Sequence, residues 1–183
     1  MIEFPKRIKA DGFWLEKVKP TFEVANHLFN IVKNQRAYLA EWLEWIDFSN
    51  SPEDMYPHLL KSSQTNNANY YIVLNKEVIG AISFVNFSEK NKIAEIGYWL
   101  SFTYNGKGIM TKAVKTLEDY GFQKLKLNRI EIRADIENKK SWKVPVRAGY
   151  KKEGILRQSS MLRGEARDII VYSKIKSEWE KGK

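Results

Sequence analysis

Residues able to bind a phosphate stand together in one short stretch, from Trp99 to Thr111. Gly106, Lys107 and Gly108 lie there between an apolar run typical of a strand and an amphipathic run typical of a helix. Glycine lets the backbone approach an anion closely, and the free N–H groups and dipole of a helix's first turn favour phosphate. The stretch therefore predicts an anion site, although a plain strand-to-helix turn explains this loop, taken alone, equally well.

Two common phosphate-binding motifs do not fit this loop. A Walker A loop needs a glycine where Ser101 stands and a serine or threonine where Gly108 stands. A dinucleotide fingerprint needs a third glycine where Thr111 stands. Too few residues also follow Asp135 to complete a doubly wound sheet.

The loop and a second block of residues together resemble the GNAT acetyltransferases. The coenzyme A pyrophosphate loop of that family is Gln or Arg, two variable residues, Gly, one variable residue, then Gly or Ala. Its place is taken here by Asn105, Gly106, Lys107, Gly108, Ile109 and Met110, and Asn105 and Met110 depart from the pattern. The run from Asn138 to Gly154 is similar to the family's Asn-x-x-Ser-x-x-Val, Gly-Phe/Tyr and Glu-Gly block.

The N-terminal third narrows the resemblance to one branch. The run from Asn34 to Trp45, with Leu39, Trp42 and Leu43 at its key positions, is similar to the Asn-x-x-x-x-Leu-x-x-Trp-Leu-x-Trp run of the RimJ/RimL branch. Members of that branch acetylate the N-terminal amine of ribosomal proteins. The likeness extends from about Phe13 to Trp179. Core packing is the alternative role for Trp42 and Trp45.

The resemblance implies that an amine attacks the thioester of acetyl-CoA directly, in a ternary complex. Such a transfer needs a neutral amine, a polarised carbonyl and a proton for the thiolate, but no covalent nucleophile, which suits a chain without cysteine. A peptide α-amine has a pKa of about 7.7 to 8.0 and a lysine of about 10.4, so a site without a strong base favours the α-amine. The expected acceptor is a protein N-terminus, such as Ser or Ala of a ribosomal protein; a small amine or an antibiotic is the alternative.

Glu95 is the predicted proton acceptor. Period-2 alternation places it on one strand face with Ile93, Gly97 and Trp99, an apolar setting for a carboxylate. Desolvation of a half-buried carboxylate raises its pKa and makes it a better base. An exposed glutamate on an edge strand is the alternative interpretation.

Ser141 is the predicted proton donor, because the RimJ/RimL branch carries a serine at this place, and Tyr150 is held in reserve. Asn138 is expected to hold the pantetheine amides. Helix capping is the alternative role for Asn138 and Ser141, since both residue types favour it. Pro145 stands inside the predicted helix, so we expect that helix to be short or kinked.

The full set of predicted contacts is larger. Coenzyme contacts are expected from Trp99, Leu100, Asn105, Gly106, Lys107, Gly108, Ile109, Met110, Thr111, Asn138 and Ser141. Acceptor contacts are expected from Tyr38, Trp42, Trp45 and Glu95.

The charge distribution agrees with an anionic ligand for the C-terminal half. The net charge is −1 over residues 1–100 and +10 over residues 101–183, which together give +9. A non-catalytic module that binds RNA or a ribosomal surface would also use such a charge. The sequence has no RNA-reading signature, so direct nucleic-acid binding is not expected.

The order of apolar patterns predicts a mixed α+β fold. Strands are expected at 13–18, 70–74, 78–87, 93–100, 129–135, 150–158 and 168–176, and helices at 22–32, 38–50, 51–61, 108–122 and 138–148. The resemblance implies a GNAT fold: a central, mostly antiparallel mixed sheet of about seven strands, flanked by helices and splayed at the fourth and fifth strands. One N-acetyltransferase domain is expected over residues 1–183.

Several absences limit the class further. The chain has no cysteine, and His27 and His58 match no zinc motif, so no metal is expected. No run of residues is apolar enough to span a membrane, and we expect a cytoplasmic protein with no membrane partner. The sequence leaves a homodimer open.

Overall fold

A single mixed sheet of eight strands runs through the part of the chain that the computed structural model describes, residues 4–64 and 68–182. Its order is β1-β2-β3-β4-β5-β6-β8-β7. All neighbouring strands are antiparallel except β5 and β6, which are parallel. The strands are β1 (Arg7–Lys9), β2 (Trp14–Lys17), β3 (Asn69–Leu74), β4 (Glu77–Ser88), β5 (Ile93–Leu100), β6 (Arg129–Asp135), β7 (Lys151–Leu162) and β8 (Glu165–Ile175).

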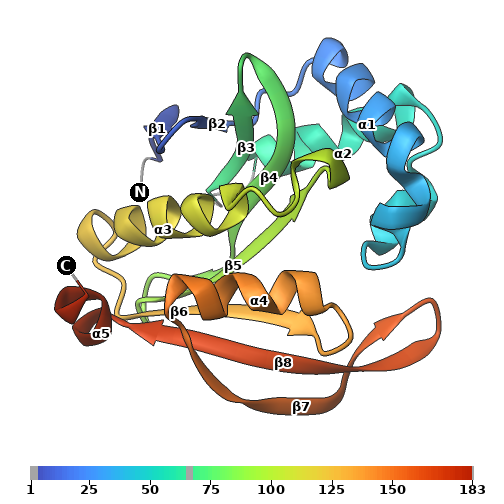
Figure 1. Ribbon diagram of the computed structural model, residues 1–183. Helices are drawn as coiled ribbons and strands as arrows, with labels where there is room; N and C mark the ends of the chain where they lie inside the picture. Colours follow the sequence, from blue (N-terminus) through green and yellow to red (C-terminus); the bar gives the residue numbers. More distant parts are fainter. Residues whose placement is uncertain (1–3, 65–67, 183) are drawn as a thin grey trace.

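Helices cover both faces of this sheet (Figure 1). They are α1 (Phe22–Ala40), α2 (Pro52–Gln64), α3 (Ile109–Gln123), α4 (Lys139–Ala148) and α5 (Lys176–Lys181), with short 3₁₀ turns η1 (Glu44–Phe48) and η2 (Phe102–Tyr104). None of these described helices is long and apolar enough to cross a membrane.

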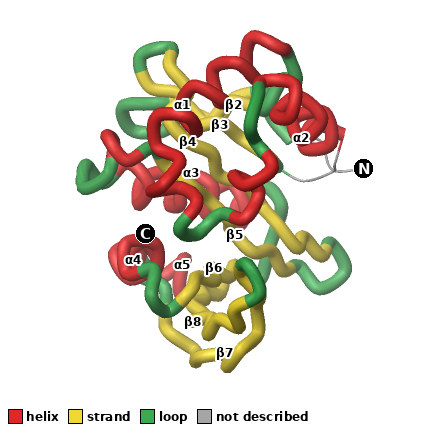
Figure 2. Tube along the Cα trace, turned by 90° about the vertical axis from the view of Figure 1, so that its right-hand side faces the viewer, coloured by secondary structure: helices red, strands yellow, loops and turns green. Residues whose placement is uncertain are grey.

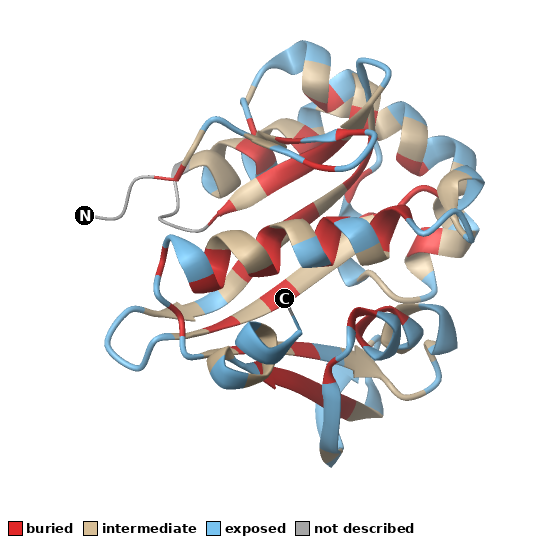
Figure 3. Ribbon diagram, turned by 60° about the vertical axis from the view of Figure 1, so that its left-hand side comes forward, coloured by how far each residue is buried: buried red, intermediate tan, exposed pale blue. Residues whose placement is uncertain are grey.

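Two apolar cores hold the layers together. The larger core packs α3 and α4 against one face of the sheet, through residues such as Val114, Phe84 and Ile130. The smaller core packs α1, η1 and α2 against the other face of β3 to β5, through residues such as Leu28 and Tyr71. Figure 3 shows buried and exposed residues alternating along the helix that crosses the sheet, as expected when one helical stripe faces a core.

Most of these elements lie where local sequence signals predict them. The hydroxyl of Ser51 accepts the N–H of Asp54 at 3.2 Å and so caps α2. Asn75 and Lys76 turn between β3 and β4 with φ values of 51° and 70°, the left-handed geometry of a tight hairpin. Strand β6 has the bounds that the alternation predicts.

The prediction differs from the structure at three places. The sheet has eight strands rather than about seven, because the short β1 pairs with β2. Helix α5 was not predicted. The helix expected at 22–32 continues to Ala40 as α1, with a kink at Gln35 (φ −134°, ψ 21°), and in place of the helix expected at 38–50 stand the end of α1 and the 3₁₀ turn η1.

The predicted splay separates β5 from β6. These strands pair only at Ile93–Arg129, Ala94–Ile130 and Glu95–Glu131. Beyond that point β5 continues to Leu100 and β6 to Asp135 without pairing to each other. Figure 2 shows β2 to β5 on one side and β6, β8 and β7 on the other. The splay leaves backbone groups of both strands available beside α3 and α4.

Candidate active site

The glycine loop ends at the N-terminus of α3, as predicted. Gly106 and Gly108 have φ values of 76° and 75°, and a Cβ added at either one would meet nothing within 4 Å. The loop is therefore open on the side where its glycines lie. Ile109 is buried in the larger core, so it offers only its backbone N–H to a ligand. The free N–H groups of a first helical turn are donors of the kind that bind anions.

Basic side chains border this loop. Lys107 extends over the ring of Tyr104, with its Nζ 5.2 Å from the ring centroid. Arg147, from α4, donates from Nε to the hydroxyl of Thr111 at 3.2 Å. Lys112, in contrast, forms an ion pair with Asp11 at 2.7 Å, and this pair lowers the pKa of the Asp11 carboxyl. Among the described residues Lys107 and Arg147 form no such ion pair, so their charges are available to a phosphate.

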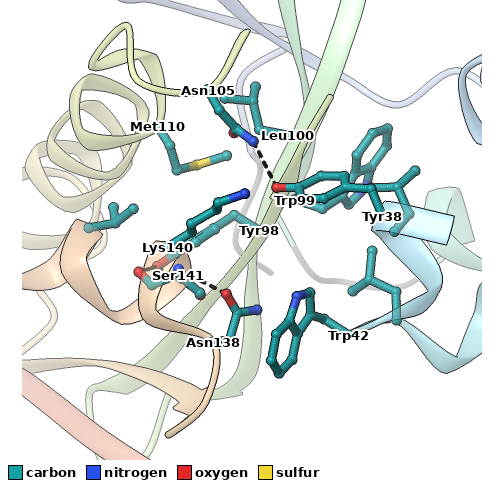
Figure 4. Close-up of a pocket in the computed structure, with 13 residues that line it drawn as sticks. Tyr38, Trp42, Tyr98, Trp99, Leu100, Asn105, Met110, Asn138, Lys140 and Ser141 are labelled. Carbon is teal, nitrogen blue, oxygen red and sulfur yellow. Dashed lines mark hydrogen bonds between the residues drawn. The ribbon is translucent and has the colours of Figure 1, made fainter. Parts of the chain in front are cut away.

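A narrow cavity of about 100 Å³, here called the slot, lies between the splayed β5 and α4. It is drawn in Figure 4 and brings together six of the predicted coenzyme contacts: Trp99, Leu100, Asn105, Met110, Asn138 and Ser141. Tyr38 and Trp42, predicted for the acceptor, line it as well. The slot joins the region of the glycine loop to Ser141.

Ser141 occupies the first turn of α4. Its N–H is accepted by the side-chain oxygen of Asn138 at 3.0 Å, so Asn138 caps the helix and also lines the slot. The reserve donor, Tyr150, lies elsewhere. It is buried beside Glu118 and Lys174. Among the described residues, Tyr150 lines neither the slot nor the second cavity, described below, that Ser141 also lines.

Pro145 explains how a tyrosine reaches Ser141. Proline has no N–H, so the carbonyl of Ser141, four residues earlier, lacks its helical partner. The hydroxyl of Tyr98 donates to that carbonyl at 2.9 Å and lies 3.5 Å from the Ser141 hydroxyl. Burial raises the pKa of Tyr98 well above its ordinary value, so it stays a donor. Helix α4 is short, as expected, and its proline serves to anchor Tyr98.

This arrangement predicts how Tyr98 and Pro145 are coupled. Tyr98→Phe leaves a partly buried carbonyl without its donor and should cost about 1–2 kcal/mol of unfolding free energy. In a Pro145→Ala background the new N–H of residue 145 can bond that carbonyl, so the same change should cost well under 1 kcal/mol. Urea denaturation of the four proteins in the cycle measures the coupling. Equal costs in both backgrounds would show that the carbonyl is satisfied in another way.

Glu95 lies in a second, larger cavity of about 620 Å³, here called the open cavity, which Trp42, Tyr98, Asn138 and Ser141 also line. Its side chain is 17% exposed, so the predicted half-burial is correct. The predicted apolar setting is wrong. Asn86 donates to the Glu95 carboxylate at 3.0 Å, and the Nε of Arg133 lies 3.6 Å from it.

The parallel pairing of β5 with β6 produces this polar setting. It places Glu131 directly beside Glu95, and adjacent like charges repel. Arg133 contacts both carboxylates, with its Nη2 2.8 Å from Glu131. Arg129 in turn binds Glu131 at 2.9 Å and also pairs with Glu153. This row of charges fixes the Glu95 carboxylate at the edge of the splay.

Helix α1 is tied directly to the loop that precedes α3. The side-chain amide of Gln35 donates to the Ser101 hydroxyl at 2.7 Å and accepts the N–H of Phe102 at 2.6 Å. Asn105 donates to the hydroxyl of Tyr38 at 2.8 Å. These contacts explain the kink at Gln35, and they place Tyr38 beside the coenzyme contacts rather than the acceptor contacts.

Trp45 lies apart from the other predicted acceptor residues. It lines a third, largely apolar cavity of about 430 Å³, here called the apolar cavity, on the α1 and α2 side of the sheet. Its ring packs against Trp99 with centroids 6.1 Å apart. Leu43 and Tyr98 line all three cavities, so the three meet there.

Sequence reasoning missed four residues at this site. Tyr98 adjoins Trp99 in a strand already assigned to the coenzyme, and strand alternation turns it to the opposite face, where α4 lies. On β6, the same alternation places Arg133 on one face with Glu131. Gln35 and Arg147 had no local signal, because their partners lie 66 and 36 positions away in the chain.

Comparison with known proteins identifies a family for this geometry. Residues 15–151 match the model of the acetyltransferase (GNAT) domain. This match includes the splayed strands, the glycine loop and α4.

Three related proteins illustrate the likeness. The ribosomal-protein-serine acetyltransferase of Escherichia coli (strain K12) is 31% identical over 152 residues, which cover 81% of this chain and 85% of that protein. The crystal structure of the microcin C7 self-immunity acetyltransferase MccE, in complex with acetyl-CoA and AMP, has a TM-score of 0.84 at 29% identity and covers 90% of this chain and 93% of that one. The structure of RimL, a ribosomal L7/L12 alpha-N-protein acetyltransferase in complex with coenzyme A, has a TM-score of 0.84 at 25% identity and covers 94% and 99%.

Proposed function

Because the chain belongs to the GNAT acetyltransferase family, in its RimJ/RimL branch, we propose that it transfers the acetyl group of acetyl-CoA to the N-terminal amine of a protein that begins with Ser or Ala, such as a ribosomal protein. One observation carries the proposal. The slot that starts near the glycine loop ends at Ser141, where the open cavity with Glu95 begins. A coenzyme and an amine can therefore approach Ser141 from opposite sides.

The glycine loop suits the coenzyme's phosphates. The first N–H groups of α3 have no partner within the helix, the loop before them is open at Gly106 and Gly108, and Lys107 and Arg147 add positive charge beside it. The end of β5, whose edge toward β6 is unpaired, offers Trp99 and Leu100 to the pantetheine amides. Residues 101–183, with net charge +10, also favour a polyanionic ligand.

Glu95 and Ser141 divide the proton transfers. Bound acetyl-CoA would supply an activated acetyl thioester. The Glu95 carboxylate takes a proton from the attacking amine, while Arg133 and Asn86 hold it in place. Ser141 would give its hydroxyl proton to the departing thiolate, and the Tyr98 hydroxyl lies 3.5 Å from the Ser141 hydroxyl.

Coenzyme A binding tests the first half of this proposal. At 100 times its dissociation constant, coenzyme A should stabilise the protein by about 2.7 kcal/mol, or about 5–10 °C in Tm for a chain of this size. Gly106→Ala should reduce that shift, because its methyl group would enter the open side of the loop. Gly164→Ala is a matched control, since Gly164 also has a positive φ (80°) and open space around it, in the β7–β8 turn.

Acetyl transfer tests the second half. Thiol release from acetyl-CoA should follow addition of a peptide with a free N-terminal Ser or Ala, and should not follow addition of the same peptide with its N-terminus already acetylated. Coenzyme binding without thiol release from any peptide would contradict the proposed acceptor. Release with small amines alone would assign the acceptor to that class instead.

A further inference from the structure

Lys140 extends from α4 across the slot toward the opposite wall (Figure 4). Its Nζ lies 5.2 Å from the ring centroid of Tyr38 in α1 and 5.4 Å from that of Phe102 in η2. A cation within about 6 Å of an aromatic ring's centroid is attracted by the ring's face. The ammonium of Lys140 is therefore held by two rings that belong to the other side of the splay.

The two rings are themselves fixed in place. The hydroxyl of Tyr38 accepts a hydrogen bond from Asn105 at 2.8 Å, and its ring meets Phe102 edge-on with centroids 5.2 Å apart. The backbone N–H of Phe102 donates to the side-chain oxygen of Gln35 at 2.6 Å. The rings thus form a preorganised site for the ammonium of Lys140.

Lys140 is the side chain of this contact that can move. Of the residues that line the slot, Lys140 alone is exposed, and all the others are half-buried or buried. It stands in the first turn of α4, where the helix dipole disfavours a cation and no acidic residue lies nearby in the turn. Its ammonium is thus held by ring contacts, which are weak at an exposed position. Contacts this weak allow the side chain to leave the slot.

The slot is too small for a coenzyme while Lys140 crosses it. Its volume is about 100 Å³. A cavity that binds benzene measures about 150 Å³. The pantetheine arm of coenzyme A, with two amides and a thiol, is larger than benzene. A side chain that lines the slot must therefore move when the arm enters, and Lys140 is the one whose exposure and contacts permit it.

We propose that Lys140 is a gate of the coenzyme site, which closes the slot while its ammonium rests on Tyr38 and Phe102 and opens before the pantetheine arm enters. This inference rests on the coenzyme half of the proposed function and not on which amine accepts the acetyl group. Because the closed state excludes the arm, coenzyme binds only the open fraction of the protein. The apparent affinity and the association rate are both reduced by that fraction.

Phe102→Leu tests the gate without changing the charge or the lining of the slot. Phe102 is 54% exposed, does not line the slot, and bonds Gln35 through its backbone. Stopped-flow tryptophan fluorescence follows coenzyme A binding, because Trp42 and Trp99 line the slot. We expect the association rate constant to rise about 2- to 5-fold, the effect of one exposed cation–π contact, with the dissociation rate constant unchanged. An unchanged association rate constant would overturn the proposal.

Two comparisons test whether the ring acts through Lys140. In a Lys140→Ala background the gate is absent, so Phe102→Leu should no longer change the association rate constant. Phe22→Leu is the matched control, because Phe22 is also exposed (51%) but lines none of the three cavities, and it should change neither rate constant. An equal effect of Phe102→Leu with and without Lys140 would contradict the gate.

Pantetheine separates the gate from an attraction between Lys140 and the coenzyme's phosphates, since it has none. Lys140→Ala should raise the affinity for pantetheine about 4- to 25-fold, because neither ring contact then competes with the ligand. Lys143→Ala removes another exposed lysine of α4, which lines none of the three cavities, and should not raise it. Isothermal titration calorimetry measures both. A pantetheine affinity that falls or stays the same in Lys140→Ala would overturn the gate.

Activity measurements keep the gate and the proposed acceptor distinguishable. If Phe102→Leu speeds coenzyme entry only when Lys140 is present, but no peptide gives thiol release, the gate stands and the proposed acceptor fails. If peptides that begin with Ser or Ala are acetylated, but Phe102→Leu binds coenzyme A at the wild-type rate, acetyl transfer stands and the gate fails.

Discussion

Replacing Lys174 with methionine is expected to lower the free energy of unfolding by about 3–5 kcal/mol at pH 7, because it leaves the Glu118 carboxylate buried without its cation. Both side chains are nearly excluded from solvent, at 9% and 5% exposure. The Nζ of Lys174 donates to both Glu118 oxygens, at 2.8 and 3.0 Å, and to the carbonyl of Ala148 at 2.8 Å. The pair thereby joins α3, β8 and the end of α4.

The loss of stability in Lys174→Met should depend on pH in a defined direction. Burial raises the pKa of Glu118 above its ordinary value, even with Lys174 beside it. The folded state therefore binds more protons than the unfolded state in the window between the ordinary and the raised pKa. Stability contributed by protonated Glu118 is present below that window and is lost as the pH rises through it. Removing the lysine widens the window upward, so Lys174→Met should regain stability on acidification from pH 7 toward pH 5.

Two controls separate the cost of leaving a charge buried without its partner from the cost of lost packing. The double variant Lys174→Met with Glu118→Met removes both charges and should recover most of the loss. Lys151→Met breaks an exposed pair with Glu178 and should cost less than about 1 kcal/mol. Urea denaturation at pH 7 and pH 5 measures all of these. A double variant as unstable as Lys174→Met would assign the loss to packing.

The sequence predicted the elements whose signals are local. Strand alternation defined β6, the glycines and the amphipathic run defined the start of α3, and Ser51 and Pro52 defined the start of α2. Each of these depends on residues within a few positions of one another. The kink in α1 could not be predicted in this way, because Gln35 bonds Ser101 and Phe102, far along the chain.

The site was predicted more completely in its membership than in its chemistry. Glu95 and Ser141 do line one cavity, with Asn138 between them in the chain. The polar setting of Glu95 depends on the parallel register with β6, which only the folded sheet reveals. Pro145 shows the same limit, since it looks unfavourable in a helix until Tyr98 is found bonded to the carbonyl that it frees.

Glu95→Gln is expected to reduce kcat/KM for a Ser-initiated peptide by about 100-fold at pH 7, the lower end of the range for a lost general base. The amide is nearly the same size and can still meet Asn86 and Arg133 in the cavity, so binding of coenzyme A should not change. The thermal shift with coenzyme A checks that expectation in the same sample. A parallel loss of coenzyme binding would instead indicate that the splayed strands had moved.

The pH dependence of the loss in kcat/KM separates two roles of the Glu95 carboxylate, deprotonation of the free ammonium and proton transfer during attack. A peptide α-amine with a pKa of about 7.7 to 8.0 is roughly a tenth to a sixth neutral at pH 7 and almost wholly neutral at pH 9. Removing the proton from an ammonium therefore explains at most about a tenfold loss, and this part should vanish by pH 9. The remaining loss of about tenfold or more should persist, because it reflects proton transfer during attack.

Glu44→Gln provides the matched charge control. Glu44 is exposed, lines the same open cavity and carries the same charge, but it lies in η1 rather than beside the splay. Its loss should change kcat/KM by less than about threefold at either pH. If Glu44→Gln matched Glu95→Gln, the effect would belong to the cavity's overall charge. A large, partly pH-independent loss confined to Glu95 requires a base at one position, which the row of charges from Arg129 to Glu95 holds in place.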